Sequence, residues 1–272
     1  MYQVDAFTRK SFGGNPAAVV VLTEFPPSAQ LQAVAGENNL SETTFIVPGE
    51  TSVAIRWFTP TVEVPLCGHA TLASAAVVLE RLRPALDRVV FDSVSGPLPV
   101  RRVDAGYAMD LPVRRCTPIR PPDGLVDALG VHPVETMWDG ANVLVRVERA
   151  ADVRNLCPDL AAIGRLPAGG VIVTAAGDEG YDCVSRYFAP AKGIPEDPVT
   201  GGAHCALTPF WAERLGRSEL RAYQASPRGG ELRCALIGDR VELTGSCVFF
   251  LEGDVEWHAG EVHTPSRSAG QP

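Results

Sequence analysis

Three side chains of this sequence carry groups that can transfer a proton. Glu42 lies in NNLSETTF, His69 follows the glycine of LCGHAT, and Asp197 lies in PEDPVT. Proton transfer needs such a group beside the substrate, with a pKa that burial or a helix terminus has tuned. Each residue also has a purely structural explanation. Glu42 could pair with Thr44 as a loop cap. Asp197 could be a turn residue, and His69 could pack at a helix start. Spacing alone leaves both explanations open.

Two of these candidates fall within a segment that the chain repeats. RWFTPTVEVPLCGHATLASAAVVLERL occupies residues 56–82, and RYFAPAKGIPEDPVTGGAHCALTPFWAERL occupies residues 186–215. The aligned pairs are Arg56 and Arg186, Phe58 and Phe188, Pro60 and Pro190, Pro65 and Pro195, Gly68 and Gly201, and Ala70 and Ala203. The second copy gains three residues before its glycine, and Asp197 lies in that insertion. The copies therefore differ where the chemistry is expected.

The order of predicted elements repeats as well. The first half predicts a strand at 17–22, a helix at 28–38, strands at 43–47 and 52–58, a helix at 68–82 and further strands to 111. The second half predicts a strand at 142–147, a helix at 152–163, strands at 170–174 and 181–188, a helix at 201–215 and further strands to 251. β-branched runs indicate the strands and 3.6-residue spacing indicates the helices.

Two copies are too few for a solenoid, which needs at least three units. The sequence therefore predicts an α+β protein of two pseudo-symmetric lobes, each a sheet-rich wrap around a central helix. Residues 1–114 are predicted as the N-terminal lobe and residues 125–262 as the C-terminal lobe. The proline- and arginine-rich stretch between them is a predicted linker, and residues 263–272 are predicted to be a disordered tail. A cleft between lobes is a preferred ligand site.

In each copy the chain turns through glycine into an apolar helix. Gly68 stands at the first turn, and Thr200, Gly201 and Gly202 stand at the second. A helix N-terminus presents unpaired N–H groups and partial positive charge, which bind a carboxylate or phosphate. Glycine lets a ligand approach the backbone. The glycines could serve only as turns, but two symmetric copies favour a clamp for a small acidic substrate.

Composition excludes several classes of function. The chain has 46% hydrophobic and 21% charged residues and a net charge of −8, with no basic stripe that would favour nucleic acid. It has no long apolar run and no signal peptide, so we expect a cytoplasmic protein without a membrane partner. Neither a GxGxxG nor a GxxxxGK[ST] motif is present, and the seven cysteines show no metal spacing. We therefore predict no cofactor and no metal.

The combined motifs resemble the phenazine biosynthesis PhzF-like family. The motifs that carry the resemblance are VDAFT, GNPAAVV, LSETTF, FTPTVEVPLCGHAT, FAPAKGIPEDPVTGGAHCAL and GGELRC, in family order along almost the whole chain. The resemblance implies a diaminopimelate epimerase-like fold, a homodimer, and cofactor-free isomerisation. The phenazine enzyme shifts a proton within trans-2,3-dihydro-3-hydroxyanthranilate. By this resemblance Glu42 is the general acid/base, and His69 and Asp197 contact the substrate.

Two departures from the family pattern matter for the reaction. Gly202 replaces a serine of the phenazine enzyme, which removes a hydroxyl contact to the substrate. Cys67 occupies the place of a catalytic cysteine of the amino-acid epimerases, but Thr200 stands at the partner position, which disfavours a two-thiol racemase. A thiolate at a helix start would still be activated. An epimerase or dehydratase with Cys67 as base is therefore the alternative enzyme, and a non-catalytic small-acid-binding protein is the other.

Overall fold

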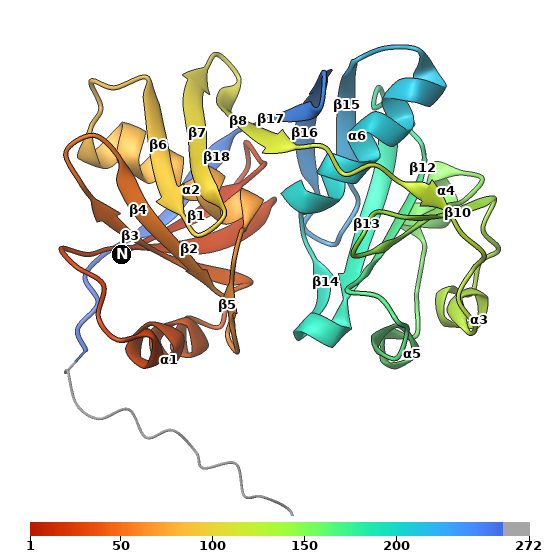
Figure 1. The fold of residues 1–272 in the computed structure, drawn as a ribbon, viewed down its shortest axis with the longest axis horizontal. Coiled ribbons are helices and arrows are strands. Elements are labelled where there is room, and N and C mark those ends of the chain that lie inside the picture. Colours follow the sequence, from red (N-terminus) through yellow and green to blue (C-terminus); the bar gives the residue numbers. More distant parts are fainter. Residues whose placement is uncertain (258–272) are drawn as a thin grey trace, which may run out of the picture.

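The two copies of the repeated sequence fold into two halves that lie side by side. Figure 1 shows the N-terminal half in red to yellow and the C-terminal half in green to blue. The computed structural model describes residues 1–257. The predicted tail at 263–272 lies outside these residues. No helix within residues 1–257 has the length and apolar character needed to cross a membrane.

Strands make up most of both halves. The strands are β1 Tyr2–Ala6, β2 Asn15–Val21, β3 Glu42–Pro48, β4 Val53–Phe58, β5 Glu63–Val64, β6 Arg88–Ser93, β7 Gly96–Val103, β8 Gly106–Pro112, β9 Thr117–Pro118, β10 Glu135–Trp138, β11 Val143–Arg146, β12 Val171–Ala176, β13 Cys183–Ala189, β14 Ile194–Asp197, β15 Glu219–Gln224, β16 Gly230–Ile237, β17 Arg240–Gly245 and β18 Cys247–Glu252. The helices are α1 Ser28–Asn38, α2 Gly68–Val77, η1 Val78–Leu82, α3 Leu125–Leu129, α4 Ala150–Arg154, α5 Leu160–Gly164, η2 Pro190–Lys192 and α6 Gly201–Leu215.

Strand pairing follows the same scheme in both halves. In the N-terminal half β2 runs parallel to β3, β3 pairs antiparallel with β4, and β4 pairs with β5 and runs parallel to β6. In the C-terminal half β11 runs parallel to β12, β12 pairs antiparallel with β13, and β13 pairs with β14 and runs parallel to β15. Two further antiparallel pairs complete each copy. The predicted α+β fold with internal pseudo-symmetry is confirmed.

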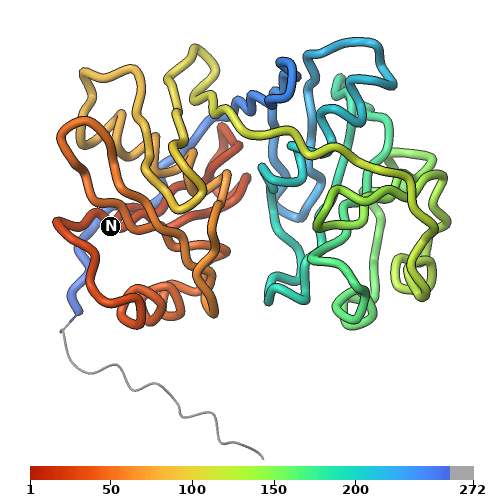
Figure 2. Tube along the Cα trace, in the orientation of Figure 1, coloured from red at the N-terminus to blue at the C-terminus, as the bar shows by residue number. Residues whose placement is uncertain are grey.

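The halves exchange their final strands. β9 follows β8 along the chain but pairs with β10 of the C-terminal half, whereas β18 follows β17 and pairs with β1 of the N-terminal half. β8 and β17 pair antiparallel with each other, from Gly245 opposite Tyr107 to Arg240 opposite Pro112. Figure 2 shows both crossing segments between the halves. Backbone hydrogen bonds therefore join the halves, while the lobe boundaries at 114 and 125 stay a prediction.

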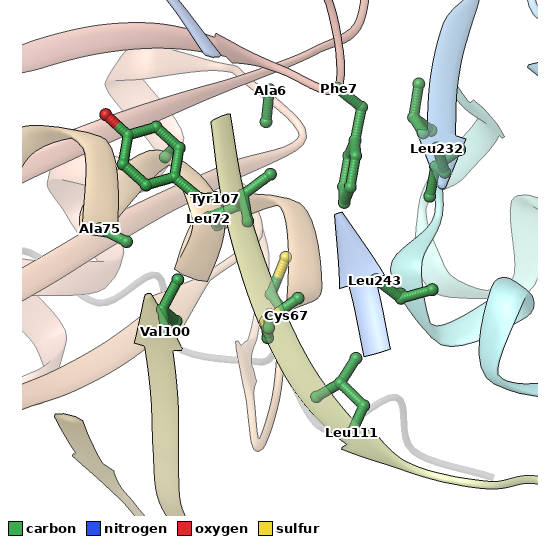
Figure 3. Packing of buried hydrophobic residues seen from close by; sticks show 14 of the residues in the cluster. Ala6, Phe7, Cys67, Leu72, Ala75, Val100, Tyr107, Leu111, Leu232 and Leu243 are labelled. Carbon is green, nitrogen blue, oxygen red and sulfur yellow. The ribbon is translucent and has the colours of Figure 1, made fainter. Parts of the chain in front are cut away.

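Each half wraps its strands around one apolar helix. In α2 every residue from His69 to Val77 is buried, as expected for a sequence, GHATLASAAV, that is apolar on almost all faces. Full burial of a side chain such as Leu72 contributes roughly 1.5–3 kcal/mol to folding. Figure 3 shows part of this core, with Leu111 from β8 and Leu243 from β17 where the halves join. The helix is therefore fixed along its length, and only its N-terminal end reaches the region between the halves.

Two predicted helices differ in detail from the structure. The helix predicted at 152–163 is two short helices, α4 and α5, because Pro158 between them lacks an N–H and disfavours helical geometry at the preceding residue. The helix predicted at 68–82 is α2 followed by a wider π-helical turn, η1. The helix predicted at 201–215 is confirmed as α6, with Pro209 inside it. Pro209 cannot donate to the carbonyl of Cys205, and the backbone N–H of Arg114 binds that carbonyl at 3.0 Å instead.

Candidate active site

A cavity of about 490 Å³ opens between the two halves where their central helices begin. All eight residues singled out from the sequence line it: Glu42, Cys67, Gly68, His69, Asp197, Thr200, Gly201 and Gly202. They come from the start of β3, the end of β14 and the starts of α2 and α6. The fold therefore brings together residues that lie up to 160 positions apart in the sequence.

Glu42 and His69 form a buried ion pair on the cavity wall. Oε2 of Glu42 lies 3.0 Å from Nε2 of His69 and has no other polar partner within residues 1–257. Glu42 is the first residue of β3, and its side chain is only 10% exposed. The suggested cap with Thr44 does not form, because the Thr44 hydroxyl is buried without a hydrogen-bond partner among the described residues. The carboxylate is therefore held by histidine alone.

Asp197 lies at the centre of a second polar network. Its Oδ1 accepts a hydrogen bond of 2.6 Å from the amide of Asn15, and its Oδ2 accepts one of 2.5 Å from the hydroxyl of Thr200. Gln224 donates to the Asp197 carbonyl at 2.7 Å and accepts from the Thr200 backbone N–H at 2.8 Å. Asp197 is therefore held at both carboxylate oxygens and at its backbone.

Asn15 links the two networks. Its amide nitrogen donates its two hydrogens to Asp197 and, at 2.9 Å, to the carbonyl of Val199, and it also lies 3.0 Å from Nδ1 of His69. Nε2 of His69 faces Glu42, and Nδ1 also lies 3.4 Å from the Cys67 sulfur. Asn15 therefore couples the ionisation of His69 to that of Asp197.

Burial and neighbouring charge shift the ionisation of this cluster. Burial is the main cause that raises the pKa of Asp197 to about 6, and the Glu42 charge adds to the rise. The His69 charge and the hydrogen bonds from Thr200 and Asn15 oppose it. Burial opposes charge on His69, yet the Cys67 and Glu42 acids beside the ring raise the pKa of His69 well above its ordinary value. Perturbed ionisation of this kind in a cleft is typical of functional sites.

The surroundings of Cys67 disfavour the activated thiolate on which the alternative enzyme depends. Burial, aided by the Glu42 charge, raises the pKa of Cys67 to about 11, so the thiol stays protonated near neutral pH. The residue precedes α2 as predicted, and Thr200 precedes α6 at the equivalent place. The partial positive charge at the helix N-terminus therefore lowers the pKa of Cys67 by less than burial raises it.

The two helix starts meet end to end. A Cβ built on Gly68 would lie 3.3 Å from the Cα of Gly201, and a Cβ built on Gly201 would lie 3.4 Å from the Cα of Gly68. Neither helix has a side-chain cap or an acidic residue in its first turn. The first N–H groups of both helices are therefore available to an anion in the cavity.

Gly68 and Gly202 are expected to respond oppositely to a side chain. Gly68→Ala should lower the free energy of unfolding by about 1–3 kcal/mol, because the new methyl meets helix backbone. Gly202→Ser should leave it within about 0.5 kcal/mol, because a Cβ there has no neighbour within 4 Å. Urea unfolding of both variants beside the wild type measures the difference. Equal stability of the two variants would contradict the close approach of the helix starts.

One set of side chains at this site could also hold a metal ion. The ligand atoms of Glu42, Cys67 and His69 all lie within 4.8 Å of one another. Carboxylate, thiolate and imidazole are donors that zinc accepts. In the structure the same atoms form the ion pair and the thiol contact described above. All seven cysteines are free thiols.

Two polar residues of these networks, Asn15 and Gln224, were not among the site residues predicted from the sequence. Asn15 is fully buried and reaches Asp197 across 182 positions of sequence. The GNPAAVV motif, one of those that carried the family resemblance, was the only signal that could have pointed to Asn15. Gln224 carried no signal of its own. Trp57, Phe58 and Phe188 are buried in the core, and Tyr187, which is also buried, lines the cavity.

Comparison with known proteins gives consistent matches along the chain. A family model described as phenazine biosynthesis-like protein, PhzC-PhzF, matches residues 4–123 and 127–253. An uncharacterized isomerase of Pseudomonas aeruginosa is 47% identical over 254 residues, covering 93% of this chain and 97% of the relative. A crystal structure of an Enterococcus faecalis protein of the PhzF family matches with a TM-score of 0.90 and 42% identity, over 94% of this chain and 98% of that one. A hydroxyproline epimerase from Agrobacterium vitis, with a TM-score of 0.53 and 10% identity over 92% of this chain and 90% of that one, shares the fold alone.

Proposed function

This chain belongs to the PhzC-PhzF family of phenazine biosynthesis-like proteins, several of which are named as isomerases, and from that premise we propose a specific reaction. The protein is a cofactor-independent isomerase that transfers a proton on a small carboxylate-bearing metabolite. The reaction takes place in the cavity between the two halves, with Glu42 as general acid and base.

The Glu42–His69 ion pair at the cavity wall is the observation that carries the proposal. The Glu42 carboxylate takes a proton from a substrate carbon, and the electron pair of the broken C–H bond moves into the adjoining unsaturated or acid group. Glu42 then returns the proton to a second carbon, which completes an isomerisation without any oxidation. A positioned carboxylate of this kind contributes about 10²- to 10⁴-fold to a rate.

The surrounding groups support such a transfer. His69 orients the carboxylate, and the paired starts of α2 and α6 bind the acid group of the substrate. The same N–H donors stabilise the negative charge that develops as the proton leaves. Asp197, which also lines the cavity and has a pKa of about 6, supplies or accepts a second proton near neutral pH.

Proton NMR in D₂O tests the reaction directly. The wild type is incubated with trans-2,3-dihydro-3-hydroxyanthranilate and with a panel of small unsaturated, amino and hydroxy acids. Enzyme-dependent entry of deuterium at a carbon position supports the proposal and identifies the substrate class. Tight binding of panel compounds without exchange favours the non-catalytic binding protein instead.

The alternative enzyme uses Cys67 as its base. The raised pKa of Cys67 speaks against it, and Thr200 donates its hydroxyl to Asp197 rather than acting as a second base. We expect Cys67→Ser to keep the exchange rate within about threefold of the wild type, because a buried protonated thiol contributes little to proton abstraction. Loss of exchange in this variant, with an unchanged fold by circular dichroism, would favour the epimerase or dehydratase.

A homodimer is part of the same proposal. It is carried from the family resemblance alone, and light scattering of the purified protein at several concentrations measures it.

A further inference from the structure

We infer that Lys192 and Arg114 form a second anion-binding subsite in the cavity, so that the substrate carries a second acidic group. This inference rests on the proposed function for the first acid group, which the helix starts bind. It narrows the substrate class to compounds with two anionic groups, either two carboxylates or one carboxylate and one phosphate.

Lys192 is held in a way that leaves most of its hydrogen-bonding capacity free. The chain has only two lysines, Lys10 and Lys192, and Lys192 lines the cavity. Its ammonium donates to the Tyr187 hydroxyl at 2.9 Å, and that hydroxyl donates to Oδ1 of Asn142 at 2.9 Å. An ammonium has three N–H donors, so two remain for a ligand.

Two glycines make room for this arrangement. A Cβ built on Gly170 would lie 2.5 Å from the Tyr187 hydroxyl oxygen, which no side chain could tolerate. A Cβ built on Gly169 would lie 3.3 Å from the Lys192 nitrogen. The backbone at these positions therefore admits the tyrosine hydroxyl and the ammonium only because no side chain is present.

Arg114 is placed at the cavity by α6. Its backbone N–H binds the Cys205 carbonyl that Pro209 leaves without a helical donor. Its guanidinium has one carboxylate nearby, Oδ2 of Asp139 at 3.9 Å. That carboxylate is fully buried and already accepts from the N–H groups of Ala141 and Asn142 and from the Asn142 amide. The arginine charge is therefore only loosely compensated.

Neither cation at this end of the cavity has a closely paired carboxylate among the described residues. Within residues 1–257 no carboxylate lies within 4 Å of the Lys192 ammonium. Burial and the neighbouring Arg114 charge lower the pKa of Lys192 despite the Asp139 and Asp197 charges that oppose this. A bound anion could contact both cations directly, whereas Asp139 lies 3.9 Å from the Arg114 guanidinium, and Arg and Lys are the residues that proteins use for carboxylate and phosphate.

Calorimetric titration tests the subsite with three small probes that carry different acid groups. Propionate carries one carboxylate, succinate carries two, and phosphoglycolate carries a carboxylate and a phosphate. We expect wild type to bind succinate or phosphoglycolate at least ~10-fold more tightly than propionate, and the tighter of the two identifies the second group. Lys192→Met and Arg114→Met should each weaken that probe ~10- to 100-fold.

Matched variants separate the subsite from general charge and from folding. Lys10→Met and Arg115→Met each remove one exposed cation and should stay within about twofold of the wild type. Lys192→Arg should recover part of the affinity, and thermal unfolding checks that each variant is folded. Equal binding of the one-acid and two-acid probes by the wild type would overturn the inference, as would unchanged affinity in Lys192→Met.

The outcome is separable from that of the proposed isomerase. Lys192-dependent binding without any deuterium exchange would retain the subsite and reject the isomerase. If the wild type and Lys192→Met catalyse deuterium exchange on one-acid compounds with the same KM, the isomerase is retained and the subsite is rejected.

Discussion

Glu42→Gln is expected to lower the rate of deuterium exchange by about 10²- to 10⁴-fold while the protein stays folded. Glutamine has nearly the same shape as glutamate but can neither take nor return a proton at the pH of the assay. Its amide oxygen can still face Nε2 of His69, so the cavity wall keeps its geometry. The measurement is proton NMR in D₂O on the compound that the wild type exchanges fastest.

Glu37→Gln is the matched control for this substitution. Glu37 lies exposed on α1, outside the cavity lining, and its replacement should leave exchange unchanged. Circular dichroism and urea unfolding of both variants check the fold. Full exchange in Glu42→Gln would show that Glu42 is not the general base, and attention would then move to Asp197, whose pKa of about 6 also suits proton transfer.

Asp197→Asn is expected to remove a pH dependence of stability of about 2 kcal/mol between pH 4 and pH 6. Asp197 has a pKa of about 6 in the folded protein against an ordinary value of 3.8. Between these values the folded state binds more protons than the unfolded state, so the contribution of Asp197 is fully present below pH 4 and is lost as the pH rises through 6. Asparagine cannot titrate and loses nothing in this window.

Urea unfolding at several pH values between 4 and 6 measures this effect as a difference. The free energy of unfolding of the wild type, relative to Asp197→Asn, should fall steadily as the pH rises. Asp104→Asn, which removes an exposed carboxylate from the turn between β7 and β8, should follow the wild-type curve. Parallel curves for the wild type and Asp197→Asn would mean that burial does not hold the proton on Asp197.

Local patterns were enough to predict the fold class and most of its elements. The helix at Ser28–Asn38 and the helix at Gly201–Leu215 have the predicted bounds, because apolar spacing and glycine signals act within a few residues. The repeated segment predicted the internal symmetry, since two similar sequences bury the same pattern of side chains. The repeated segment also placed His69 and Asp197 near one cavity, and the LSETTF motif added Glu42.

Local sequence patterns could not predict that the two halves exchange their final strands. β9 is only two residues long. Its pairing with β10 depends on where β8 ends relative to the C-terminal half. β18 looks, in sequence, like the last strand of the second copy. Its pairing with β1 is decided by which sheet edge is open once β8 and β17 have joined the halves.

The residue types show which groups can react, whereas contacts between distant segments set how those groups ionise. A helix start suggested an activated Cys67 thiolate, yet burial raises the pKa of that thiol to about 11. Asn15 reaches Asp197, and Arg114 reaches the cavity, through contacts between segments 91 or more positions apart. The pKa of a group in the cavity depends on burial by, and charges on, neighbours that come from distant segments of the chain. A local pattern of residues does not contain that information.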